Sequence, residues 1–96
     1  MGIFVEVTKL ENEDENFVYY KYQFSLPTDE YKTNSGKVRY KVKVVSGSLK
    51  LEKRNGELYI IELAEGDGGS HVNCAYSALL RHWRKGEYPD KTFWES

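Results

Sequence analysis

The sequence has a single cysteine and no long apolar run, and these two absences narrow the class of protein. One cysteine in 96 residues cannot form an internal disulfide, so nothing argues for an oxidising compartment. No apolar stretch approaches the length of a membrane helix, and no basic segment followed by an apolar run opens the chain. We therefore expect a cytoplasmic protein with no membrane partner.

The composition is that of a folded chain. Hydrophobic residues make up 40% and aromatic residues 15% of the sequence, which is more than disordered chains carry. The length fits one domain over residues 1–96, and the chain contains no linker, internal repeat or low-complexity segment. No motif of known chemistry is present, so the sequence predicts no cofactor and no enzyme.

Residues 37–63 have the pattern of three antiparallel strands joined by two tight turns. The first strand, residues 37–45, alternates strictly, which predicts one core face and one basic face. The core face would hold Val38, Tyr40, Val42 and Val44, and the basic face Lys37, Arg39, Lys41 and Lys43. Ser46-Gly47 and Asn55-Gly56 are typical hairpin turns, and the second predicts that Leu51 lies opposite Ile60.

The last strand of this stretch and two segments that precede it complete the predicted sheet. Residues 58–63 are apolar on both faces, so we expect a helix or a partner to cover each side. Residues 3–10 and 17–26 also read as strands, and closing their hairpin with Leu10 opposite Phe17 places Val7 opposite Tyr20. Pro27 should end the second of these strands, which leaves residues 28–36 as the longest polar loop.

One convincing helix is expected at residues 71–85. Ser70 is a suitable N-cap and Gly86 a suitable left-handed residue after the end of the helix. An apolar stripe at helical spacing should pack on the sheet through Val72, Ala75, Tyr76, Leu79 and Trp83. The tail, residues 87–96, is rich in aromatic residues and should fold back on the domain.

These elements predict an α+β fold. It consists of an antiparallel β-meander of about five strands, one C-terminal α-helix packed on the sheet, and an aromatic tail that closes an edge.

Charge is segregated along the chain. Residues 1–36 carry seven acidic and three basic side chains, residues 37–54 one acidic and seven basic, and residues 55–96 seven acidic and four basic. A central basic hairpin is thus flanked by acidic segments, which either neutralise it within the fold or leave a surface of two signs.

The acidic groups are candidates for contact with a basic partner. The loop before the second strand holds four carboxylates in five residues, and two more acids precede the helix. The candidate residues are Glu11, Glu13, Asp14, Glu15, Glu65 and Asp67. The loop also has the composition of a solvated hairpin tip, and it lacks the spacing and glycine of a calcium site, so no metal is predicted.

The basic strand is the alternative candidate, for nucleic acid, through Lys37, Arg39, Lys41 and Lys43. An interpretation without any ligand is that this strand is a solvent-exposed edge strand, whose lysines discourage aggregation. Two weaker candidates are a phosphate site at residues 66–70 and a metal or catalytic group formed by His71, Cys74 and His82. The first lacks the spacing of known phosphate loops, and nothing in the sequence makes the second group converge.

The string RHWRKGEYPDKTFW, residues 81–94, is similar to the ending of a group of small uncharacterised bacterial proteins built as a strand meander, a helix and a Trp-containing tail. In size, plan and segregated charge, the chain also resembles immunity proteins of bacterial toxin systems, including contact-dependent growth inhibition. The second resemblance is one of format and has no diagnostic motif.

The resemblance implies a cytoplasmic protein that neutralises a cognate protein toxin by occluding its active site, with charged loops setting rate and specificity. Our preferred interpretation is therefore a non-enzymatic binding protein of this kind. The alternative is a small nucleic-acid-binding module that uses the basic strand. A third interpretation is a small nuclease that uses His71 and His82.

Overall fold

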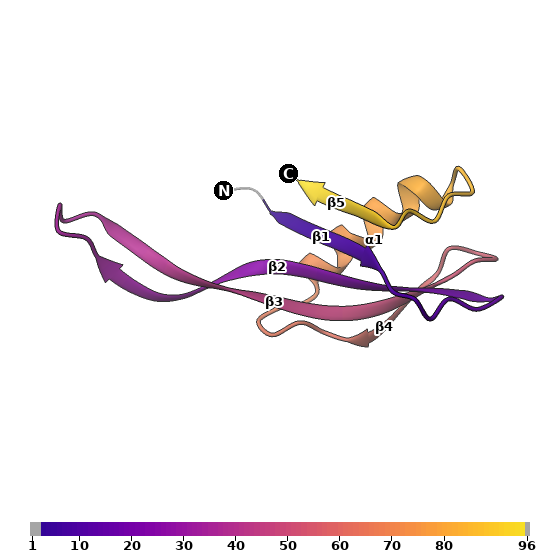
Figure 1. Cartoon of the computed structure of the whole chain (residues 1–96), viewed down its shortest axis with the longest axis horizontal. Coiled ribbons are helices and arrows are strands. Elements are labelled where there is room, and N and C mark those ends of the chain that lie inside the picture. The colour runs from indigo at the N-terminus through magenta and orange to yellow at the C-terminus, as the bar shows by residue number, and fades with distance from the viewer. Residues whose placement is uncertain (1–2, 96) are drawn as a thin grey trace.

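Five antiparallel strands form one sheet, and a single helix packs on one of its faces (Figure 1). The computed structural model describes residues 3–95. The order of strands across the sheet is β4-β3-β2-β1-β5. The elements are β1 (Phe4–Lys9), β2 (Phe17–Lys32), β3 (Val38–Glu52), β4 (Leu58–Glu62), α1 (Ser70–Trp83) and β5 (Lys91–Glu95).

The predicted α+β class and antiparallel sheet are confirmed, with one correction. The helix is not the C-terminal element, because the aromatic tail forms β5 and pairs with β1 along its whole length. Gly86 has a φ of 74°, which is the left-handed conformation expected after the helix. The reversed chain then places β5 at one edge of the sheet.

The core lies between α1 and the face of the sheet that the helix covers. The face expected for the first two strands and the apolar stripe of the helix are confirmed, because alternate strand residues and the same helix positions are buried. The fully buried side chains include Val5, Val7, Val18, Tyr20, Tyr22, Leu49, Leu51, Val72 and Leu79. No helix or strand within residues 3–95 covers the opposite face of the sheet, which is called the open face below.

The predicted turn at Ser46-Gly47 is wrong. β3 runs straight through both residues, with Tyr22 of β2 opposite Gly47. A Cβ on Gly47 would lie 2.5 Å from the Tyr22 ring and 2.5 Å from the Glu62 carbonyl oxygen. Gly47 therefore allows a ring and a neighbouring backbone to approach closely, which is the other common role of glycine in a strand.

The predicted end of β2 at Pro27 is also wrong. Pro27 pairs with Val42, the ladder shifts between Pro27 and Glu30, and β2 continues to Lys32. Proline cannot donate a backbone hydrogen bond, which accounts for an irregularity rather than an ordinary ladder at this point. The chain reverses only at residues 33–36, where Gly36 has a φ of 81°. The expected loop at 28–36 is thus mostly strand.

In the hairpins β1–β2 and β3–β4, the pairing of the strands is shifted by two residues from the predicted register. Val7 lies opposite Tyr22 rather than Tyr20, because Asp14 Oδ1 accepts the amides of Asn16 and Phe17 and forms a turn inside the loop. A shift of two residues preserves the face of every side chain, which is why the predicted core survived.

At the second of these hairpins, Leu51 lies opposite Leu58 rather than Ile60, and no residue other than glycine has a positive φ in residues 3–95. The turn at Asn55-Gly56 is therefore wider than the expected type I′ turn. It is fixed to the helix, since Tyr76 donates a 2.7 Å hydrogen bond to the Gly56 carbonyl and Trp83 Nε1 one of 2.9 Å to the Lys53 carbonyl.

β4 forms the other edge of the sheet, and the expectation that both of its sides are covered is wrong. Tyr59, Ile60 and Ile61 are 40%, 49% and 53% exposed. The helix lies over β1, β2 and β5 and does not reach this strand (Figure 1).

Replacing Gly47 with alanine should destabilise the fold by about 3 kcal/mol, because two of the three atoms nearest the new Cβ belong to backbone that cannot move aside. The free energy of unfolding in urea measures the effect. Gly68→Ala is the matched control, since a Cβ there meets nothing within 4 Å, and it should change stability by less than about 0.5 kcal/mol. Equal stability of the two variants would contradict the role given to Gly47.

Candidate binding surfaces

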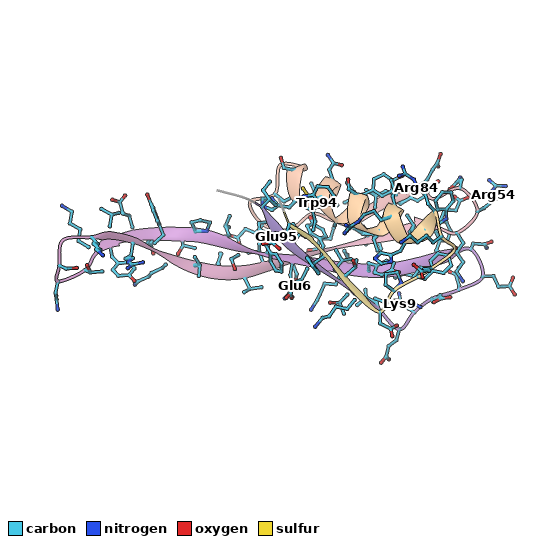
Figure 2. All side chains as sticks on the ribbon, turned by 90° about the horizontal axis from the view of Figure 1, so that it is seen from above. Glu6, Lys9, Arg54, Arg84, Trp94 and Glu95 are labelled. Atoms are coloured by element: carbon cyan, nitrogen blue, oxygen red, sulfur yellow. The ribbon has the colours of Figure 1, made fainter. Side chains whose placement is uncertain are left out.

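The outer halves of β2 and β3, residues 26–44, project from the body as a two-stranded arm (Figure 1). The arm makes the molecule long and narrow, with extents of 55 × 22 × 21 Å. Beyond its root, where Glu65 contacts Lys43, no second layer formed by residues 3–95 covers the arm, and its side chains extend into solvent on both sides (Figure 2). Seven residues of each strand give it a length of roughly 23 Å.

On one face of the arm, β3 contributes an apolar row, whereas the β2 residues paired with Tyr40 and Val38 on that face are the charged Glu30 and Lys32. The four residues predicted to be core on the first basic strand lie here instead: Val38, Tyr40, Val42 and Val44 are 47%, 58%, 63% and 65% exposed. The core prediction was wrong because β3 continues past the body, so nothing in residues 3–95 reaches these side chains. An exposed row of three β-branched residues and one tyrosine is typical of a protein-binding surface.

This apolar row continues onto the open face of the body. Phe4 and Phe93 are each about half exposed, and their ring centroids lie 5.9 Å apart. A shallow hollow of about 190 Å³, lined by residues that include Phe4, Ser25 and Val44, joins the aromatic pair to the root of the arm. Exposed apolar side chains therefore occur on this face from the arm to β5, interrupted in the hollow by the hydrogen-bonded pair Glu6 and Gln23.

The other face of the arm is basic and lies on the helix side of the sheet. It presents the four residues predicted as the nucleic-acid alternative, Lys37, Arg39, Lys41 and Lys43, and all four are exposed. The arm carries five basic and two acidic side chains, so its net charge is +3 while the rest of the chain is −4. Only Lys43 among the four is neutralised within residues 3–95, by a 2.8 Å contact with Glu65.

The acidic loop lies at the opposite end of β2 from the arm. Glu13 bridges Lys9 and Lys53 at 2.9 and 2.7 Å, and these hydrogen bonds lower its pKa to about 2. Asp14 caps the turn, and the backbone hydrogen bonds from Asn16 and Phe17 lower its pKa as well. Two of the four predicted contact acids thus already serve the fold, whereas Glu11 and Glu15 are exposed and have no ion pair in residues 3–95.

The other two predicted acids are not close to this loop. Glu65 contacts Lys43 at the root of the arm, roughly 30 Å along β2 from Phe17. The structure therefore separates the six acidic candidates into two groups at different ends of the body.

Asp67 is buried and belongs to the fold. Its carboxylate accepts a 2.7 Å hydrogen bond from the Tyr22 hydroxyl and further bonds from the amides of Gly69, His71 and Val72. Burial opposes ionisation, but the hydrogen bonds outweigh it and the pKa of Asp67 is lowered. A rigid partner has no access to this side chain.

The position of Asp67 also argues against a phosphate site at residues 66–70. Its carboxylate occupies the helix amides that an anion would need, and the helix begins at Ser70 with Gly69 as N-cap instead of the predicted Ser70. The N-terminus of α1 is thus already capped from within the chain.

The histidines do not converge. The imidazole of His71 stacks on Phe24 with 3.6 Å between centroids, whereas His82 lies near the other end of α1, about 17 Å along the helix axis. Within residues 3–95, no three His, Cys, Asp or Glu side chains are grouped so that they could hold a metal ion. The arrangement does not form the catalytic pair that the nuclease interpretation required.

Comparison with known proteins does not assign a function. No family model, no curated protein and no solved structure matches the chain. The one helix described in residues 3–95 has 14 residues and is too short and too polar to cross a bilayer. Function must therefore be argued from the surfaces themselves.

Sequence reasoning missed the apolar face of the arm and found the residues of its basic face. The signal was ambiguous, because a strand that alternates valine and lysine has the same pattern whether its apolar face is core or an exposed binding surface. Only the length of β2 and β3 beyond the helix distinguishes the two.

Asp67→Asn should lower the free energy of unfolding at pH 7 by about 2 kcal/mol, since it removes the charge that accepts four hydrogen bonds. The depressed pKa of Asp67 means that its contribution is present above the unfolded pKa of about 4 and is lost as pH falls through the folded value. The loss of stability between pH 5 and pH 2 should therefore be smaller in the variant than in the parent.

Urea unfolding at each pH measures this difference, with Glu65→Gln as the control because its carboxylate is exposed. An Asp67→Asn variant whose stability falls as steeply with acid as that of the parent would show that Asp67 does not contribute to the acid dependence.

Proposed function

We propose that this chain is a non-enzymatic binding protein that holds a partner protein through its arm. The observation that carries the proposal is the exposed apolar face of residues 38–44, which nothing in residues 3–95 covers. Nucleic acid backbones offer charge to a binding surface, whereas a row of valines and a tyrosine requires apolar partner surface.

In its specific form, the proposal is that the partner is a cognate toxin and that the arm occludes the active site of the toxin. A ribbon about 23 Å long and two strands wide can enter a cleft that the broader body cannot. The charges support a directed encounter, because the arm is +3 and the remainder is −4. This form includes a cytoplasmic location, as expected for a protein that protects its own cell.

The exposed acids of the β1–β2 loop have a secondary part in the proposal. Glu11 and Glu15 are exposed at the far end of the body from the arm and are available to a basic region of a large partner. Glu13 and Asp14 are already engaged within the chain, and they contribute through the shape of the loop.

A second candidate function is nucleic-acid binding through the basic face of the arm. The observation that favours it is the two-stranded form of the arm, since the major groove of DNA admits a two-stranded β-ribbon. Lys37, Arg39 and Lys41 would contact phosphates in that case, and binding would fall steeply with salt.

The double variant Tyr40→Ser/Val42→Thr should weaken binding of the protein partner roughly tenfold or more, because it removes apolar anchors at the centre of the proposed interface. Both side chains are more than half exposed, so stability should change by less than about 0.5 kcal/mol. The experiment isolates the stoichiometric partner from nuclease-treated lysate, measures its Kd by titration, and tests whether the complex blocks the toxic activity of the partner.

Ile60→Thr/Ile61→Thr is the matched control, since these side chains are similarly exposed but lie on β4, outside the arm. Equal loss of affinity in both double variants would contradict the arm as the binding element. Loss of ligand on nuclease treatment, together with weak binding by Arg39→Gln/Lys41→Gln, would instead establish the nucleic-acid function.

Glu11→Gln/Glu15→Gln should slow association with the protein partner about fivefold at low salt and leave dissociation nearly unchanged, because exposed peripheral charges act mainly on encounter. Stopped-flow mixing at two ionic strengths measures both rates. If association and its salt dependence equal those of the parent, the acidic loop takes no part in binding.

A further inference from the structure

A hollow of about 410 Å³ lies between the last turns of α1 and the outer edge of β5. It lies outside the arm, and none of its cations belongs to the surfaces proposed above. We call it the basic hollow, and the residues that line it are Arg81, His82, Lys85, Lys91, Thr92 and Phe93.

The basic hollow collects positive charge without a balancing acid. Arg81, Lys85 and Lys91 form no ion pair in residues 3–95, whereas Lys9 and Lys53 on the body and Lys43 on the arm are each paired with a glutamate. No carboxylate among residues 3–95 lines the hollow. Near it, Glu87 Oε1 lies 3.4 Å from Nδ1 of His82, and Asp90 precedes Lys91.

The helix dipole accounts for only part of this cluster. Cations favour the C-terminal end of a helix, and Arg81 and His82 lie in the last turn of α1. Lys91 belongs to β5 and has no such reason to be there. Two separate elements therefore bring their cations to one concave surface.

The donors are held in place. Arg81 donates a 3.1 Å hydrogen bond to the Phe93 carbonyl, and its guanidinium lies 5.8 Å from the centre of the Trp94 ring, which leaves the other guanidinium N–H groups for a ligand. Nε2 of His82 lies 3.2 Å from the Thr92 hydroxyl. A planar fork fixed by a backbone bond is suited to the bidentate recognition of an oxyanion.

The strand register adds a backbone donor. The Lys9 amide bonds the Asp90 carbonyl, and Thr92 pairs with Val7, so alternate residues of β5 direct their backbone groups toward β1. Phe93 lies between those positions and directs its groups outward, as its bond from Arg81 shows. Its amide thus points to the same edge as the basic side chains.

We propose that the basic hollow binds a phosphate monoester. Its three cations match a dianion, and the guanidinium fork, the Thr92 hydroxyl and the Phe93 amide offer several donors to one tetrahedral group. A carboxylate would use only the fork. Phe93 contributes its backbone to the hollow, because its ring packs against Phe4 on the open face.

The test titrates the full chain with inorganic phosphate and with a 5′-mononucleotide at constant ionic strength, and follows the amide NMR signals of Thr92 and Phe93. Both probes should give saturable shifts at these residues. Lys85→Gln/Lys91→Gln should weaken binding about tenfold, because it removes two cations that make no hydrogen bond or ion pair in the fold. Arg81→Lys keeps the positive charge but removes the planar guanidinium, so it should weaken phosphate binding about fivefold.

Arg84→Gln is the matched control, since it removes an exposed cation of the same helix that does not line the hollow, and its Kd should stay within about twofold of the parent value. Shifts that do not saturate, or an equal effect of Arg84→Gln and Lys85→Gln/Lys91→Gln, would overturn the proposal. A short oligonucleotide without a terminal phosphate serves as the third probe, and tighter binding of it than of the mononucleotide would overturn the assignment to a monoester.

Discussion

The hydrogen bond between Tyr22 and Asp67 joins the sheet to the start of the helix, and most of the fold depends on it. The Tyr22 hydroxyl donates to Asp67 and accepts from the Ala64 amide, so one buried side chain fixes both ends of the connection between β4 and α1. Asp67 in turn satisfies three amides at the helix start. A buried carboxylate is stable only when it is fully bonded in this way.

That hydrogen bond explains why β3 has a glycine at position 47. The Tyr22 ring has to cross the neighbouring strand to reach Asp67, and it does so over Gly47, where no side chain could be accommodated. The glycine therefore sits in the middle of a 15-residue strand, where it weakens β-structure but permits the contact. The network also anchors the body close to the point where the arm begins, two residues from Phe24 and Val45, which are the last buried residues of β2 and β3 before the arm.

The three surfaces of the molecule are separated in space and differ in chemistry. The arm has an apolar and a basic face, the β1–β2 loop is acidic, and the basic hollow lies beside β5. The exposed arm makes the free protein prone to aggregation, because β-branched side chains on an unpaired ribbon associate with one another unless a partner covers them. Its lysines lower that risk in the free protein, which gives the basic face a role whatever the partner is.

The sequence by itself determined which side chains share a face. Alternation in the strands and the helical stripe correctly placed Val5, Tyr20 and Leu79 in the core, and they also predicted the α+β class and the returning tail. These properties follow from local periodicity, which does not depend on where a strand ends. Registers were two residues off and the faces were still correct, because the side-chain period of a strand is two.

Only the tertiary structure decided where the chain turns and what each surface is for. A glycine within a strand pattern is compatible either with a turn or with a site where a neighbouring group approaches the backbone closely. At Gly47 the Tyr22 ring approaches the backbone, because Tyr22 hydrogen-bonds the distant Asp67. Because β3 continues through Gly47, the four residues predicted to be core lie on an exposed face instead: Val38, Tyr40, Val42 and Val44. Asp67, predicted to contact a partner, is instead buried and caps the helix. The basic hollow depends on β5 returning beside α1, a contact between segments whose spacing in the sequence carries no periodic signal.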